Sequence, residues 1–420
     1  MYRRMTMRKL WCAMFVAAIC GIMLNQALAG PVADIMVVND VFTIGDDIDV
    51  WVTAVNPTHE FEIDVYLMAT TDGSTAYLTP SGWGSEQKPF IAGYMMPQLT
   101  EPVTLRLASV TAGQPPASAG KKCTLKLWIT PSNVPEMVYC DDEAAFSVAP
   151  EGFVAIPSGR FMMGTGHTPC PFLDQIPHKV CLTSFFMAET ETTVADFAAF
   201  LNEAGATVAD CDVVGPDGGR WAYRGSLAVD FNDGVFTPKA GYEDYPATVR
   251  YVGAAAYVAS MGAKLPTEAQ WEYAARAFAP GDYPWGNEES CDWGNIWVDG
   301  DACNSWLLPV RSFPPNGFGL YEVCGNATEI CSDWFDRDEH NGLPWGESYY
   351  QWCYENYPDG IVNPQGPPGP PPGIEPTYYA PWRVTRGGPP TSPYMCMLWA
   401  RATMIGPDFN SFRVVLEPPR

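Results

Sequence analysis

Basic residues and histidines are both scarce in this chain of 420 residues. It has 24 lysines and arginines against 48 aspartates and glutamates, and its four histidines lie far apart. Such an acidic surface repels nucleic acid and anionic lipid, and it favours cations or basic partners. The sequence also has no Ser-His-Asp order, no phosphate-binding loop and no dinucleotide fingerprint. These absences argue against common hydrolase, nucleotide-binding and nucleic-acid-binding classes.

Long apolar runs are absent except near the N-terminus. Four basic residues precede the apolar residues 10–24, and Ala27-Leu28-Ala29 has the form of a signal-peptidase site. The run is shorter than the roughly 20 residues that a membrane span needs. A membrane anchor, or a lipoprotein signal at Cys20, is the alternative, but the residues before Cys20 fit a lipobox poorly. We interpret residues 1–29 as a cleaved signal peptide and expect a secreted or periplasmic protein, without a stable membrane span after cleavage.

The remaining composition indicates a folded, loop-rich chain. Removing Cys12 and Cys20 with the signal peptide leaves eleven of the 13 cysteines, so at least one thiol is free or pairs with another chain. Several others should form disulfides in an oxidising compartment. The 40 prolines and 38 glycines argue against a helical bundle, and 13% aromatic residues argue against disorder. A length of 420 residues favours two domains.

Residues 30–149 are predicted to form an all-β domain. Segments that alternate or run apolar at strand length are separated by turn signals such as Asn56-Pro57 and Asp72-Gly73. The clearest segments are 48–54, 63–68, 105–108 and 125–130. This pattern predicts a β-sandwich of immunoglobulin-like size. Cys123 and Cys140 are the only cysteines of this domain, so we expect them to pair with each other.

Five motifs beyond Gly152 resemble one protein family. The longest is PVRSFPPNGFGLYEVCGNATEICSDWF, at residues 309–335; the others are at 153–164 (FVAIPSGRFMMG), 264–277 (KLPTEAQWEYAARA), 283–287 (YPWGN) and 382–388 (WRVTRGG). Together they resemble the formylglycine-generating enzymes, also called sulfatase-modifying factors. The resemblance implies that residues 150–420 form a mixed α+β, C-type-lectin-like domain with little regular structure.

The motif at 264–277 predicts the clearest helix of the chain. Thr267 is a candidate N-cap, and Gln270 three residues later completes a capping box. Glu268 and Glu272 lie one turn apart, a spacing that suits paired carboxylates in acid–base chemistry. The family assigns them no such role, and we expect structural hydrogen bonds instead.

The resemblance implies two structural calcium sites, because Asn side chains, backbone carbonyls and carboxylates supply the oxygen ligands that calcium prefers. Asp299 is a rival to Asp301 in the first segment, where Cys303 falls at a carbonyl donor, and Cys324 is a less certain neighbour in the second. The predicted ligands are Asn295, Ile296 and Asp301 in the first segment, and Gly325, Ala327 and Glu329 in the second.

The copper centre of the family is not intact in the sequence. Family enzymes use two cysteines five residues apart after the Gly-Gly pair to bind copper and activate oxygen. Here the corresponding positions after Gly388 are Ser392 and Met397, and the segment contains one cysteine, Cys396. Soft thiolates select Cu(I) as a pair, so we do not expect copper. Cys396 is a weak catalytic candidate, and a half-cystine or buried thiol is the favoured interpretation.

We therefore predict a non-catalytic, calcium-stabilised domain that binds a protein or glycan ligand through the loop between Gly388 and Arg401. The alternative is a formylglycine-generating oxidase acting on a sulfatase cysteine. An iron-dependent oxygenase of the same superfamily is the third interpretation. That branch uses histidines close in sequence, and the histidines here show no such spacing: His59, His167, His178 and His340.

Overall fold

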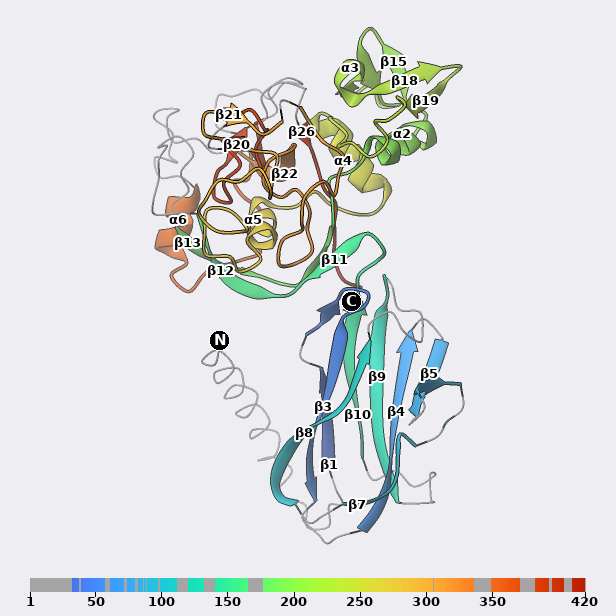
Figure 1. Cartoon of the computed structure of the whole chain (residues 1–420). Coiled ribbons are helices and arrows are strands. Elements are labelled where there is room, and N and C mark those ends of the chain that lie inside the picture. Colours follow the sequence, from blue (N-terminus) through green and yellow to red (C-terminus); the bar gives the residue numbers. More distant parts are fainter. Residues whose placement is uncertain are drawn as a thin grey trace. The chain divides into compact units, whose positions relative to one another are not determined.

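The computed structural model is mostly β, with few and short helices (Figure 1). It describes residues 32–37, 39–56, 61–71, 74–79, 82–85, 87, 89–96, 99–111, 120–131, 140–164, 177–304, 306–335, 349–370, 382–392, 395–403 and 410–419. The predicted signal peptide lies outside these residues. Within them, no helix is both long and apolar enough to cross a membrane.

The chain divides into two compact units between Phe146 and Ser147, close to the predicted break after residue 149. Two short pieces, 39–44 and 119–121, group with the second unit. The first unit consists of strands: β1 (Val32–Val37), β3 (Asp47–Asn56), β4 (Phe61–Thr71), β5 (Ser74–Thr79), β6 (Gly82–Gly84), β7 (Ile91–Met96), β8 (Leu99–Thr111), β9 (Lys122–Pro131) and most of β10 (Cys140–Val148).

The strands of the first unit belong to two sheets. One has the order β1-β3-β8, and in the other the strands of this unit have the order β10-β9-β4-β5-β6 with β7 beside β4. Strand β4 pairs antiparallel with β9, with Leu67 opposite Leu127, and both side chains are buried. The predicted strand segments 48–54, 63–68, 105–108 and 125–130 lie within β3, β4, β8 and β9.

The register of β9 and β10 argues against the predicted Cys123–Cys140 disulfide. These neighbouring strands are joined by only eight residues, which requires an antiparallel pair. Lys126 and Glu143 form an ion pair at 3.6 Å, so Cys123 lies near the end of β10, while Cys140 is at its start. Cys123 and Cys140 are therefore about six residues apart along the strand direction, a distance of about 20 Å. A disulfide cannot span that distance.

The second unit contains many short elements joined by long irregular connections (Figure 1). They are β2 (Val41–Phe42), β11 (Phe153–Ile156), β12 (Gly159–Met163), β13 (His178–Leu182), β14 (Phe185–Ala188), α2 (Val194–Glu203), β15 (Thr207–Ala209), β16 (Asp212–Val214), β17 (Arg220–Tyr223), α3 (Arg224–Leu227), β18 (Val229–Asn232), β19 (Val235–Pro238), α4 (Tyr251–Ser260), α5 (Glu268–Arg276), β20 (Trp297–Val298), β21 (Asp301–Ala302), β22 (Thr328–Trp334), α6 (Tyr349–Asn356), β23 (Ile361–Val362), β24 (Arg383–Arg386), β25 (Ala402–Thr403), β26 (Asn410–Ser411) and β27 (Val415–Leu416).

A four-stranded sheet and helix α5 frame the centre of the second unit. The sheet has the order β25-β24-β22-β26, and Glu329 in β22 lies opposite Arg386 in β24. Two apolar clusters surround it. One gathers around Phe197 of α2 and Phe412, whose rings are 6.2 Å apart, and the other gathers around Trp271 of α5. The sheet thereby brings charged residues from distant parts of the sequence into a closed interior.

Candidate functional site

Helix α5 is the element that positions the buried charged groups. Its N-terminus has the predicted capping box: Thr267 Oγ1 accepts a hydrogen bond from Gln270 N, and Gln270 Oε1 accepts one from Thr267 N. The helix begins at Glu268 and ends at Arg276, where Ala277 follows in the left-handed conformation with φ 42°. This capping fixes the first turn, so that Glu268 and Glu272 project inward on one face.

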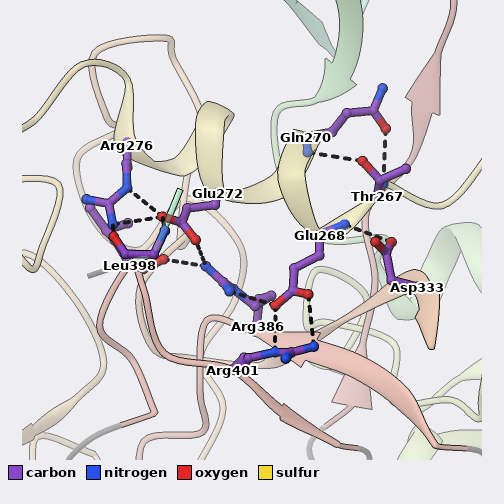
Figure 2. Close-up of polar contacts among 10 residues, drawn as sticks. Thr267, Glu268, Gln270, Glu272, Arg276, Asp333, Arg386, Leu398 and Arg401 are labelled. Carbon is purple, nitrogen blue, oxygen red and sulfur yellow. Dashed lines mark hydrogen bonds and ion pairs between the residues drawn. The ribbon is translucent and has the colours of Figure 1, made fainter. Parts of the chain in front are cut away.

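Both glutamates are paired with arginines (Figure 2). Arg386 bridges them, with Nη1 2.8 Å from Glu268 Oε1 and Nη2 2.6 Å from Glu272 Oε2. Arg401 binds both oxygens of Glu268 at 3.1 and 3.2 Å, and Arg276 binds Glu272 at 2.8 Å. We call these five residues the ion-pair network. Because its carboxylates are wholly buried and paired, the network is structural, as the sequence predicted, and neither carboxylate is available as a free base.

The pKa shifts around the network follow from burial and pairing. Burial raises the pKa of Glu272, but Arg276 and Arg386 outweigh it and hold that pKa below its usual value. Asp333 lies at the start of α5, where its Oδ2 accepts a hydrogen bond from Glu268 N at 2.8 Å. Burial, together with the nearby charge of Glu268, raises the pKa of Asp333 to about 7. Asp333 is thus the buried acid here whose charge changes near neutral pH.

Glu329, a predicted calcium ligand, is held by cationic and neutral donors. Arg413 donates to both carboxylate oxygens, from Nε at 2.6 Å and from Nη2 at 2.5 Å, and Trp271 Nε1 donates at 2.8 Å. The Arg413 and Glu329 side chains are fully buried. A guanidinium bound to both oxygens occupies the carboxylate and repels a divalent cation. This arrangement does not fit calcium at Glu329.

The structure brings the two predicted calcium segments together. Asn326 N donates to the carbonyl of Asn295 at 3.0 Å, and a Cβ at Gly325 would lie 2.3 Å from that carbonyl oxygen. Gly325 has φ 86°, so both space and backbone conformation require glycine there. The adjacent Ala327 is fully buried. The two segments therefore pack closely against each other in the interior of the second unit.

The first predicted calcium segment is tied by backbone hydrogen bonds. Asn295 Oδ1 accepts a hydrogen bond from Asn304 N at 3.1 Å, and the Ile296 carbonyl accepts one from Cys303 N at 2.8 Å. Asp301 is exposed in β21, and its carboxylate accepts from Ala302 N. Among the described residues, no three acidic, histidine or cysteine side chains form a metal-binding group. The oxygen atoms of Asn295 and Ile296 retain lone pairs, so this segment is the better remaining fit to calcium.

The segment after the Gly-Gly pair is closed rather than open. Gly387 and Gly388 have φ 83° and 70°, and a Cβ at Gly388 would lie 2.4 Å from the backbone of Met395. The chain therefore folds back onto the two glycines, and residues 396–400 are all buried. Residues 396–400 pack inward because Met397, Leu398, Trp399 and Ala400 are apolar and join Cys396 in the interior. Thr391 is exposed, and Ser392 and Met395 are half-buried, so the prediction that the loop between Gly388 and Arg401 faces a ligand stays a prediction.

A second thiol lies against Cys396. Cys324 Sγ donates to the Cys396 carbonyl oxygen at 2.5 Å, and Cys396 Sγ donates to the Ser392 carbonyl at 3.9 Å. Tyr283 and Ile296 belong to the same buried cluster. We call these four residues the thiol pocket. The bond from Cys324 lowers the pKa of Cys396 against the effect of burial, whereas burial raises the pKa of Cys324.

Comparison with known proteins assigns this architecture to a family. A family model described as the sulfatase-modifying factor enzyme 1-like domain matches residues 142–402, more than half of the chain. The chain belongs to this family. The match includes the whole of the ion-pair network and the thiol pocket, and it confirms the resemblance read from the five motifs.

Relatives of this sulfatase-modifying factor-like protein have more than one named activity. The formylglycine-generating enzyme of Streptomyces coelicolor is 32% identical over 230 residues, covering 44% of this chain and 69% of that protein. The Bos taurus formylglycine-generating enzyme is 28% identical over 284 residues, covering 59% and 67%. A Chlamydia trachomatis protein, serine/threonine-protein kinase Pkn1, is 29% identical over 241 residues, covering 56% and 32%. The activity must therefore be argued from the residues of this chain.

Sequence reasoning treated Cys324 only as a neighbour of the second calcium segment. The thiol pocket was missed because its cysteines are 72 residues apart and only Cys324 lies in one of the five motifs. The available sequence signal was Gly325 beside Cys324 and the Gly387-Gly388 pair before Cys396, since glycines permit close approach of two backbones. In the structure, Gly325 N donates to the Gly387 carbonyl at 2.7 Å. Of the four histidines, only His178 lies in the described residues, so the histidine argument stays a prediction.

Proposed function

We propose that this sulfatase-modifying factor-like protein is a secreted, non-catalytic binding protein with a protein or glycan ligand. One observation carries the proposal. Cys396 supplies the only thiol of the segment after the Gly-Gly pair, and its side chain is fully buried together with residues 397–400. A substrate cysteine must reach the reacting thiolate for oxidation to formylglycine. A closed segment favours recognition at another surface over chemistry at this one.

The exposed tryptophans of residues 285–306 are the best candidates for that surface. Trp293 is 46% exposed and Trp306 is 50% exposed. Trp293 stacks on Trp285, which in turn stacks on Tyr283 of the thiol pocket, at centroid distances of 6.5 and 5.2 Å. The stacked rings of Tyr283 and Trp285 support the exposed ring of Trp293. Tryptophan is among the residues that contribute most at binding interfaces. We therefore place the ligand-binding surface at the exposed tryptophans rather than at the buried residues 396–400.

Three further features belong to the proposal. The signal peptide at residues 1–29 directs export, and the first unit is an immunoglobulin-like sandwich that serves as a spacer or adhesive module. Calcium binds the loop of Asn295, Ile296 and Asp301 and stabilises it, with Glu329 outside the coordination sphere. These features support one another, because an exported loop-rich domain gains stability from disulfides and calcium.

The catalytic question is tested with copper and a peptide that carries the cysteine of a sulfatase motif. Purified protein is loaded with copper, incubated with the peptide under oxygen, and the peptide is analysed by mass spectrometry. We expect no aldehyde product. Product that is lost in Cys396→Ala and retained in Cys331→Ala would overturn the non-catalytic assignment, since Cys331 is a buried thiol outside the thiol pocket.

The binding surface is tested with Trp293→Ala and Trp306→Ala. The probes are a glycan array and proteins of the culture medium immobilised in defined fractions. Binding by the wild type that drops at least tenfold in either variant supports this surface. Tyr354→Ala is the matched control, because Tyr354 is 56% exposed on α6 and outside residues 285–306. Equal binding by all four proteins would place the ligand elsewhere.

The thiol pocket favours one alternative, a formylglycine-generating oxidase with an unusual sulfur pair. Cys324 supplies the second sulfur that the segment after Gly388 lacks, and two thiolates are what Cu(I) selects. In that case Cys324→Ala and Cys396→Ala would both abolish aldehyde formation. The same peptide assay therefore separates the two functions.

A further inference from the structure

Cys324 and Cys396 are two buried cysteines that lie in contact without a disulfide bond between them. Both side chains are buried, at 3% and 0% exposure. Cys324 Sγ lies 2.5 Å from the backbone carbonyl of Cys396, and Cys396 Sγ donates to the Ser392 carbonyl at 3.9 Å. Because Cys324 Sγ touches the backbone of Cys396, rotation of the two side chains can bring the sulfurs to bonding distance.

The surrounding backbone keeps the two cysteines together. Gly325 N donates to the Gly387 carbonyl at 2.7 Å, directly after Cys324. The positive φ of Gly388 then turns the chain so that Met395 and Cys396 pack against it. The contact is thus built by two independent backbone features rather than by one flexible side chain.

We propose that Cys324 and Cys396 form a disulfide in the exported protein and so cross-link the segment after the Gly-Gly pair to the family signature motif. The bond closes a loop of 72 residues, against 12 for the disulfide between Cys291 and Cys303. Longer loops restrict the unfolded chain more strongly, so this cross-link is the more stabilising of the two. The inference does not depend on the ligand or on the absence of catalysis.

The chemistry requires an oxidant, and a protein disulfide carrier of the export compartment supplies it. The Cys396 thiolate attacks one carrier sulfur and displaces the other as a thiolate. The deprotonated Cys324 then attacks Cys396 Sγ in this mixed disulfide and releases the second carrier thiolate. Two thiols of this chain lose two protons and two electrons, and the carrier disulfide is reduced to a dithiol. Because both sulfurs are buried in the finished fold, the exchange takes place during folding.

Peptide mapping tests the cross-link. Protein collected after export is denatured without reductant, its free thiols are blocked with N-ethylmaleimide, and it is cleaved with trypsin. We expect peptide 312–337, which contains Cys324, joined to peptide 387–401, which contains Cys396. The disulfide between Cys291 and Cys303, which lie together in peptide 277–311, is the internal standard for complete oxidation.

Matched variants identify the sulfur involved, since Cys331 shares peptide 312–337 with Cys324. We expect the joined peptides to persist in Cys331→Ala and to disappear in Cys324→Ala. N-ethylmaleimide on both Cys324 and Cys396, with the internal standard intact, would overturn the proposal. A link from Cys396 to Cys331, or to any other cysteine, would overturn it as well.

Thermal unfolding gives a second readout that does not rely on peptides. Loss of one cross-link lowers the Tm by about 5–10 °C. Cys324→Ala, Cys396→Ala and the double variant should all show the same decrease, because each removes the same bond. Decreases that add in the double variant would show two independent buried thiols and contradict the disulfide.

Discussion

The ion-pair network and the thiol pocket are both buried in the second unit, but they hold their polar groups in different ways. In the network, every carboxylate oxygen of Glu268 and Glu272 accepts a hydrogen bond from an arginine. In the thiol pocket, two weakly polar groups contact each other, and the Tyr283 hydroxyl has no partner among the described residues. Buried charged groups require a partner for every polar atom, whereas buried thiols tolerate missing hydrogen bonds and can still form a disulfide.

The largest effect is expected where the network loses its central cation. Arg386→Met leaves Glu272 Oε2 without an arginine, while Glu268 Oε1 keeps Arg401 as its partner. Removal of one partner from a buried ion pair costs about 4 kcal/mol of unfolding free energy, and urea unfolding of the variant measures this loss. Arg276→Met is the control, because Glu272 is the only carboxylate that Arg276 contacts among the described residues and its side chain is 14% exposed, so we expect a smaller loss. Equal losses in both variants would show that Arg386 is not the centre of the network.

The second prediction asks whether Glu329 behaves like the network or like a calcium ligand. Glu329→Gln leaves the buried Arg413 without its counter-charge and should cost about 3 kcal/mol. If Arg413 is the main partner, the loss of stability is the same with and without a calcium chelator. A chelator that lowers the Tm of the wild type but not of Glu329→Gln would instead restore Glu329 as a ligand. Asp301→Asn is the parallel test of the exposed loop, where any sensitivity to chelator should be lost.

The third and smallest effect concerns pH. Asp333 has a pKa of about 7 in the folded protein against 3.8 as its ordinary value, so the folded state binds a proton that the unfolded state releases. Its contribution is complete below pH 3.8 and is lost as the pH rises through 7. Asp333→Asn should remove this pH dependence between pH 3.8 and 7, measured as the difference between two series of unfolding curves. Identical curves for wild type and variant would mean that Asp333 is ionised throughout.

The elements and residues that sequence predicted correctly depend on local rules or on the family motifs. The capping box of Thr267 and Gln270 spans four residues, and the strand segments of the first unit follow from alternation alone. The family motifs assigned Asn295 and Gly325 to two separate calcium segments, and the structure places the backbones of these segments in contact.

The errors share a different cause, because each required knowledge of a distant partner. The role of Glu329 is decided by Arg413, which lies 84 residues away. The pairing of Cys123 with Cys140 was inferred because they are the only cysteines of residues 30–149. That argument takes no account of strand register. The burial of residues 396–400 was not foreseen, because it depends on a buried cluster that their apolar side chains join. Long-range contacts of this kind follow from packing, which no single motif encodes.

The disulfide between Cys291 and Cys303 has a consequence for how the protein withstands proteases. Its bond encloses eleven residues, including the exposed Trp293. A protease that cuts one peptide bond inside this ring produces two chains that remain covalently attached. The nicked molecule keeps its mass until a reductant is added, and its aromatic surface stays anchored at both ends. A cut in this exposed loop therefore does not release a fragment.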